Sequence, residues 1–220
     1  WLCEAATFVY DFDRFDAHDI LPMFAEYKIT TFCAPTTMYR FFIKEDLKNY
    51  DLSSIKYATV AGEAMNPEVY NQFLKATGIR IMEGFGQTET TLTIANFVGE
   101  TNKIGSMGKP SPLYDVDIQL ADGKPAGVGE VGEIVIRTEE AVPNGLYEGY
   151  YLDEEKTKDV WHDGYYHTGD TAWKDEDGYF WYVGRVDDLI KSSGYRIGPF
   201  EIESVIMELP YVLECAVVAA

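Results

Sequence analysis

Helical and extended patterns alternate through the first part of the chain, and this alternation constrains the fold more than any other feature. Apolar residues recur at helical spacing in some segments and form short runs in others. The expected order is a helix over 17–28, a strand over 29–34, a helix from Thr36 or Thr37 to Ile43, a strand over 55–61, a helix capped by Asn66 and a strand over 79–82. This order predicts an α/β fold, with a mostly parallel sheet that helices cover on both faces.

The stretch Gly84-Phe85-Gly86-Gln87-Thr88-Glu89 follows the last predicted strand. We expect a loop here, at the edge where open α/β sheets bind their ligands. Glycine lets the backbone approach a ligand, and Phe85 offers a flat face to a base. Thr88 offers a hydroxyl to a phosphate oxygen, and Glu89 an oxygen ligand to Mg²⁺. Alone, such a stretch is more often an ordinary turn, so the nucleotide interpretation needs support from the rest of the chain.

The chain is strongly acidic. It carries 18 Lys and Arg against 37 Asp and Glu, a formal charge of −19. Nucleic acids and anionic membranes need clustered basic residues, so neither is expected as a partner. No apolar stretch approaches the length of a membrane span, and 46% hydrophobic residues are ample for a globular core.

The three cysteines, Cys3, Cys33 and Cys215, are scattered along the chain. Their odd number and their apolar or small neighbours predict reduced thiols, buried for packing, in a cytosol-like compartment. A cytoplasmic location is therefore expected. The sequence begins at Trp1 without an initiator Met, so we expect a piece of a longer protein, and a mitochondrial matrix location stays open.

Composition changes divide the chain into three expected units, over 1–100, 101–186 and 187–220. The first is the predicted α/β subdomain. The second has strand patterns separated by turns, which predicts a β-rich, barrel-like subdomain. The third has a predicted hairpin and a helix opened by Pro199, the start of a small α+β C-terminal domain. The first two units would form part of one large N-terminal domain.

Four further motifs carry polar groups that suit a nucleotide, although each also has an ordinary structural explanation. Ala61-Gly62-Glu63-Ala64-Met65 follows a predicted strand, where its backbone could reach the ligand crevice. An ordinary strand-to-helix turn can have the same sequence. In Tyr166-His167-Thr168-Gly169-Asp170, the carboxylate can accept from two ribose hydroxyls or cap a turn. Gly184-Arg185-Val186-Asp187-Asp188 suits a surface salt-bridge cluster, and the turn 192–199 carries Arg196, which can face a phosphate.

In this order, together with Gly-Glu-Ile-Val-Ile-Arg at 132–137, the motifs resemble the core motif series of the adenylate-forming superfamily. The resemblance covers nearly the whole chain from Asp11 onward and is strongest with medium-chain acyl-CoA synthetases, acetyl-CoA synthetases being nearby relatives. It implies an acid–thiol ligase, which joins a carboxylic acid to AMP, releases pyrophosphate and passes the acyl group to coenzyme A. The implied small molecules are therefore a carboxylic acid, ATP, Mg²⁺ and coenzyme A; the oligomeric state stays open.

The resemblance also implies roles for individual residues. The implied nucleotide-binding residues are Gly62, Glu63, Ala64, Glu83, Gly84, Phe85, Gly86, Gln87, Thr88, Asp170 and Arg185. Phe85 would stack on the adenine, and Asp170 with Arg185 would hold the ribose. Thr88, Glu89 and Arg196 are the implied catalytic residues, with Mg²⁺ on Glu89. These cationic and polar groups suit a reaction in which a carboxylate meets an anionic α-phosphate.

Further implied residues concern the second half reaction and the acid. Ser193, Gly194 and Tyr195 would border the pantetheine tunnel of coenzyme A, and Asp187 would be the hinge of the small domain. Acetate-specific relatives carry a tryptophan at the position of Gly86, so glycine predicts an acyl pocket open to medium-chain or aryl acids.

The phosphate-binding loop and the terminal lysine of the family lie outside this sequence, so we expect little activity from the chain alone. Two alternatives stay open: an adenylation domain that loads a carrier protein, and a noncatalytic AMP-binding module.

Overall fold

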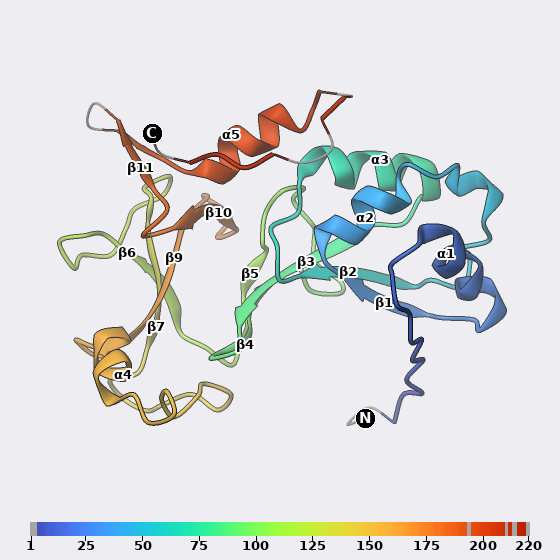
Figure 1. Cartoon of the computed structure of the whole chain (residues 1–220). Helices are drawn as coiled ribbons and strands as arrows, with labels where there is room; N and C mark the ends of the chain where they lie inside the picture. The colour runs from blue at the N-terminus through green and yellow to red at the C-terminus, as the bar shows by residue number, and fades with distance from the viewer. Residues whose placement is uncertain (1–3, 193–194, 210, 213–214, 219–220) are drawn as a thin grey trace.

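The computed structural model describes residues 4–192, 195–209, 211–212 and 215–218. Its largest features are two β-sheets that lie beside each other, with helices on the first (Figure 1). None of the helices in these ranges is both long and apolar enough to cross a membrane. The α/β fold class is confirmed.

The first sheet has five strands in the order β1-β2-β3-β4-β5. They are β1 (Thr31–Ala34), β2 (Tyr57–Ala61), β3 (Ile81–Gln87), β4 (Thr91–Ala95) and β5 (Lys109–Pro110). β1, β2 and β3 are parallel, as the helix–strand alternation predicts, and β4 and β5 extend the sheet in the antiparallel sense. The parallel strands are joined by helices, whereas β3 and β4 are joined by a tight turn, which permits only antiparallel pairing.

One face of the parallel strands packs against the helices α1 (Ala17–Glu26), α2 (Thr36–Phe42) and α3 (Pro67–Thr77) and a short 3₁₀ turn (Leu47–Asn49). Asn66 caps α3 as expected: its side chain accepts from the backbone N–H groups of Glu68 and Val69. Gly78 ends that helix in the left-handed region, at φ 72°. The core between helices and sheet is rich in aromatic rings, with Tyr39 and Phe73 centroids 5.2 Å apart.

Only one face of the parallel strands is covered within the described ranges. Ala34 and Val60 point into the helical core and are buried. Cys33 and Tyr57 lie on the opposite face and are exposed. Two predictions are therefore wrong for this part of the chain: helices do not cover both faces, and Cys33 is not a buried packing residue. Strand alternation places neighbours on opposite faces, so the apolar neighbours of Cys33 do not determine its own burial.

The second sheet is antiparallel, with strand order β10-β9-β7-β6 and β8 paired to β9. Its strands are β6 (Val116–Gln119), β7 (Gly132–Arg137), β8 (Trp161–His162), β9 (Tyr165–Lys174) and β10 (Phe180–Arg185); α4 (Glu154–Val160) precedes β8. A core that includes Ile94, Met107 and Phe180 joins this sheet to the first. The predicted β-rich subdomain is confirmed as a curled sheet (Figure 1).

The last described part contains the hairpin of β11 (Ile190–Ser192) and β12 (Tyr195–Ile197), followed by α5 (Pro199–Ile206). These are the hairpin and the proline-initiated helix expected from the sequence. α5 packs beside β10, with the rings of Phe200 and Tyr182 5.9 Å apart. The division into 1–100, 101–186 and 187–220 stays a prediction.

Candidate active site

The glycine stretch forms the end of β3 and a tight turn, whereas the sequence predicted that a loop begins at Gly84. β3 continues to Gln87 and pairs with β4, with a register shift between Phe85 and Gly86. A Cβ atom at Gly86 would lie 1.8 Å from the carbonyl oxygen of Thr91. Glycine is therefore required here because two strands approach each other closely. The sequence alone does not distinguish a glycine of this kind from a glycine in a loop.

One cavity of about 170 Å³ collects most of the predicted nucleotide residues. Its predicted lining residues are Gly62, Glu63, Ala64, Glu83, Gly84, Phe85, Gly86 and Asp170. The first three follow β2, the next four belong to β3, and Asp170 comes from β9 of the other sheet. The structure thus brings motifs that are distant in sequence to one site between the two sheets.

Met107 and Tyr182 also line this cavity, and the sequence analysis missed both. Met107 lies in the segment before β5 and is 2% exposed, among the residues that join the sheets. Tyr182 lies on β10, and its hydroxyl is 3.4 Å from Asp170 Oδ1. The position of Tyr182, two residues before the Gly-Arg-Val-Asp-Asp motif, could have indicated that it lies near the site. No motif in the sequence pointed to Met107.

Glu83 is a buried carboxyl group among the residues that line the cavity. It is 7% exposed, and its Oε1 accepts a hydrogen bond from the backbone N–H of Met65 at 3.1 Å. Burial raises the pKa of Glu83 to about 7, although the Met65 hydrogen bond opposes the shift. A carboxyl group near its pKa at neutral pH can either donate to or accept from the edge of a purine base.

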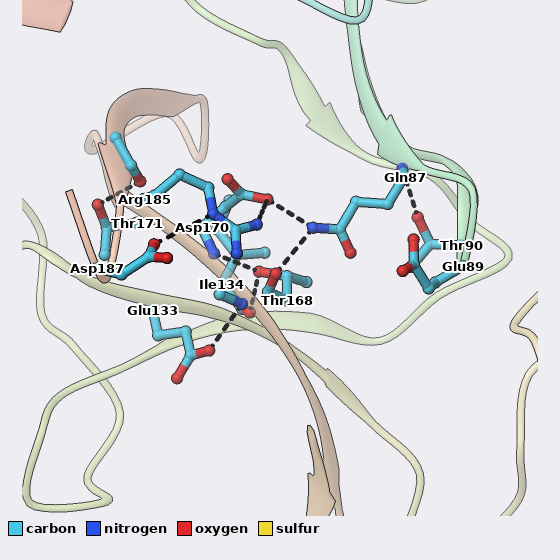
Figure 2. Close-up of polar contacts among 12 residues, drawn as sticks. Gln87, Glu89, Thr90, Glu133, Ile134, Thr168, Asp170, Thr171, Arg185 and Asp187 are labelled. Carbon is cyan, nitrogen blue, oxygen red and sulfur yellow. Dashed lines mark hydrogen bonds and ion pairs between the residues drawn. The ribbon is translucent and has the colours of Figure 1, made fainter. Parts of the chain in front are cut away.

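Asp170 and Arg185 are cross-strand neighbours on β9 and β10. Arg185 Nη1 lies 3.8 Å from Asp170 Oδ2 (Figure 2). Burial raises the pKa of Asp170 above its usual range, while Arg185 and the hydrogen bond from Gln87 oppose that shift. Asp187, the predicted hinge, is exposed in the turn after β10, and its Oδ1 is 3.4 Å from Arg185 Nε.

Gln87 is not among the residues that line the cavity holding Phe85; it lines the adjacent cleft, and its nucleotide-binding role stays a prediction. The Gln87 side chain reaches to the second sheet and bonds Thr168 and Asp170 (Figure 2). In a regular strand, residues 85 and 87 would lie on the same face of the sheet. The pairing of β3 with β4 shifts register between Phe85 and Gly86, so the two side chains point in different directions.

An adjacent cleft of about 890 Å³ holds Gln87, Glu89 and Arg185 together with Tyr150 and Lys156, among others. Thr88 is exposed at the turn between β3 and β4. Glu89 is half-buried, and its Oε1 accepts from the Tyr150 hydroxyl at 3.0 Å. Tyr150 was also missed, because its segment carries no chemical motif.

Glu89 fits the requirements of a magnesium site of the nucleotide-dependent kind. Mg²⁺ is typically held by one or two carboxylates together with substrate phosphates, not by an all-protein cage. The described residues contain no group of three or more His, Cys, Asp and Glu that could hold a metal. Glu89, a single carboxylate that lines a cleft, agrees with a site that substrate phosphates would complete.

The remaining predicted residues come from the last part of the sequence. Ser193 and Gly194 lie outside the described residues. Tyr195 and Arg196 lie on β12, where Arg196 is opposite Lys191. Their assignment to coenzyme A and to catalysis stays a prediction.

Comparison with known proteins agrees with this geometry. A family model described as AMP-binding enzyme matches residues 1–151. The chain is 44% identical over 220 residues to acyl-coenzyme A synthetase ACSM3, mitochondrial, of Mus musculus and also 44% identical to ACSM4, mitochondrial, of Homo sapiens. In both cases the match covers 100% of this chain and 38% of the relative. The chain therefore spans well under half the length of these relatives.

Solved structures show the same fold. The structure of the anthranilate CoA ligase AuaEII in complex with anthranoyl-AMP is 32% identical, with a TM-score of 0.84 over 92% of this chain and 38% of that one. A benzoate CoA ligase from Burkholderia xenovorans LB400 is 27% identical, with a TM-score of 0.80 over 94% of this chain and 40% of that one. With the family model matching more than half of its length, the chain belongs to the AMP-binding enzyme family.

Proposed function

We propose that the protein carrying this chain is an ATP-dependent acid–thiol ligase that makes acyl-coenzyme A. The observation that carries the proposal is the cavity between the two sheets, which holds residues 62–64, 83–86 and Asp170 from motifs far apart in sequence. The names of the relatives support it, since those of Mus musculus and Homo sapiens are acyl-coenzyme A synthetases.

The proposed chemistry has two steps. A carboxylate oxygen of the acid bonds to the α-phosphorus of ATP, and the bond from that phosphorus to the pyrophosphate oxygen breaks. The sulfur of coenzyme A then bonds to the acyl carbon, and AMP leaves as the thiol proton is lost. The first step brings two anions together, so the protein has to align and neutralise them.

The chain's own groups suit the first step. Phe85 lines the cavity and would support the adenine, where base stacking contributes about 1–3 kcal/mol. Asp170 and Arg185 would hold the ribose, and Thr88 would contact the α-phosphate and the acid. Glu89 would hold Mg²⁺, which supplies charge neutralisation when bound. Arg196 would add a second positive charge.

The second step would use the last part of the chain. Asp187 lies in an exposed turn between β10 and β11, where a change of backbone angles disturbs no ladder. It would serve as the hinge between the unit 101–186 and the unit 187–220. Ser193, Gly194 and Tyr195 would then border the pantetheine arm of coenzyme A.

A medium-chain or aryl acid is the proposed substrate. The resemblance implies that glycine at position 86 leaves the acyl pocket open, and two of the similar structures are ligases of anthranilate and benzoate. ATP–pyrophosphate exchange by the full-length gene product with acetate, hexanoate and benzoate tests the proposal. Exchange with hexanoate or benzoate is expected, a clear preference for acetate would contradict the acid assignment, and no exchange with any acid would favour a noncatalytic AMP-binding module.

The proposed location is mitochondrial. The relatives of Mus musculus and Homo sapiens are named mitochondrial, and this favours the matrix over the cytosol expected from the cysteines. Fluorescence microscopy of the tagged full-length gene product tests this location.

A further inference from the structure

Both N–H donors and the oxygen of the Gln87 side-chain amide are hydrogen-bonded to groups of the protein. Its Nε2 donates to Asp170 Oδ2 at 2.6 Å and to the Thr168 carbonyl oxygen at 2.8 Å. Its Oε1 accepts from the hydroxyl of Tyr166 at 2.8 Å. Both N–H donors are therefore used within the fold, and the amide has no donor left for a bound nucleotide.

The partners also determine the orientation of the amide. An ionised carboxylate only accepts hydrogen bonds, so the nitrogen of Gln87 must face Asp170 and the oxygen must face Tyr166. Tyr166 is 2% exposed, and Asp170 is 6% exposed. Hydrogen bonds to a charged group are among the stronger ones, and burial removes the competing water.

These contacts join two sheets that no ladder connects at this point. Gln87 is the last residue of β3 in the first sheet, whereas Tyr166, Thr168 and Asp170 belong to β9 in the second. Figure 2 shows the Gln87 amide reaching toward Thr168 and Asp170. The backbone of Gln87 is also held in place, because its N–H donates a hydrogen bond to Thr90 Oγ1 at 3.0 Å. Without the amide, the Asp170 carboxylate would keep, among the residues that the structure describes, the longer contacts at 3.4 Å to Tyr182 and 3.8 Å to Arg185.

We propose that Gln87 is a positioning residue that holds the Asp170 carboxylate toward the ribose of ATP, with Tyr166 orienting the amide. The inference rests on the proposed function, because it takes Asp170 as the acceptor of the ribose hydroxyls. It assigns Gln87 a role through Asp170 in place of the direct nucleotide contact that the sequence predicted.

The test compares ATP with 2′,3′-dideoxy-ATP, which lacks both ribose hydroxyls, in pyrophosphate exchange by the full-length gene product. The wild type should prefer ATP by roughly tenfold or more in kcat/KM, since hydrogen bonds to a buried charge are lost with the dideoxy nucleotide. Gln87→Ala should lower kcat/KM for ATP by roughly tenfold and leave that for the dideoxy nucleotide nearly unchanged, so that the preference largely disappears. The KM for the acid should not change.

Two further variants keep the test informative if Gln87→Ala is poorly folded. Gln87→Glu retains the shape of the side chain but sets a second carboxylate against Asp170, so it should lose the ribose preference at least as strongly. Tyr166→Phe removes only the orienting hydroxyl and should give a smaller loss of the same kind. Gln72→Ala is the control, since Gln72 is exposed on α3 and its side chain donates to Glu68 on the same helix, away from the cavity.

The outcomes separate the inference from the function on which it rests. A wild type that exchanges pyrophosphate and prefers ATP, with variants that lose activity toward both nucleotides equally, would show that Gln87 is only a structural brace and would overturn the inference. A wild type that exchanges pyrophosphate without preferring ATP would also overturn it. A wild type with no exchange for any acid would overturn the proposed function and the inference with it.

Discussion

The hydroxyl of Tyr150 donates a hydrogen bond to Oε1 of Glu89 at 3.0 Å, across the cleft between the β3–β4 turn and the segment before α4. The same ring lies 4.5 Å from Lys156 Nζ, in a cation–π contact. Burial and the neighbouring Glu89 carboxylate raise the pKa of Tyr150, which keeps its hydroxyl a donor at all working pH values. The relationship predicts that Tyr150 fixes the orientation of the proposed magnesium ligand.

Tyr150→Phe in the full-length gene product should therefore raise the metal concentration needed for half-maximal exchange by about three- to tenfold, the range expected for one lost hydrogen bond to a charged group. Electron paramagnetic resonance of Mn²⁺ in the presence of ATP measures the binding directly. Tyr151→Phe is a matched control, because Tyr151 is 92% exposed. An unchanged metal dependence in Tyr150→Phe would contradict the prediction.

Glu83 predicts a pH dependence of stability. Its folded pKa of about 7 lies above the ordinary 4.5, so between these values the folded state keeps a proton that the unfolded state has lost. The free energy of unfolding should thus fall as pH rises from about 4.5 to 7, by an order of 3 kcal/mol from this group. Glu83→Gln should remove this fall and make the protein more stable than wild type at pH 8.

Urea unfolding of both proteins at pH 5 and pH 8 checks the Glu83 prediction. Glu154→Gln serves as the control, because the Glu154 side chain is 92% exposed. Equal pH dependence in wild type and Glu83→Gln would show that the carboxyl group ionises normally in the folded state.

Gly86→Ala should destabilise the β3–β4 hairpin. The new Cβ atom would lie 1.8 Å from the Thr91 carbonyl oxygen, so the strands must separate, and overpacking of this kind costs about 1–3 kcal/mol. Gly127→Ala is the comparison, because its nearest neighbour would be the end of the Glu130 side chain at 3.1 Å, which can move. Thermal unfolding measures both. Equal melting temperatures would contradict the close approach at Gly86.

Asn66→Ala should lower the free energy of unfolding by about 1–2 kcal/mol, since two backbone N–H groups of α3 lose their acceptor. Asn66→Asp keeps that acceptor and should lose much less. Asn66 is 2% exposed, so water cannot readily replace the lost oxygen. Chemical denaturation compares the two variants, and equal losses would show that the cap does not stabilise α3.

The sequence by itself determined the elements whose causes are local. The order of helices and strands follows from side-chain periodicity, and the start of α3 follows from Asn66 and the proline after it. The motif series also identified most of the cavity lining, from Gly62 to Asp170, because a motif records the chemical groups that a ligand needs.

Only the tertiary structure decided which of those side chains line the cavity and which are bonded to other parts of the protein. The amide of Gln87 turns to Asp170, 83 residues away, and Cys33 faces the open side of its sheet. Glu83 has a raised pKa because of what buries it, and Met107 lines the cavity because two sheets meet there. Burial, strand register and long-range hydrogen bonds depend on contacts between segments that are distant in sequence. Local periodicity and motif spacing therefore cannot predict them.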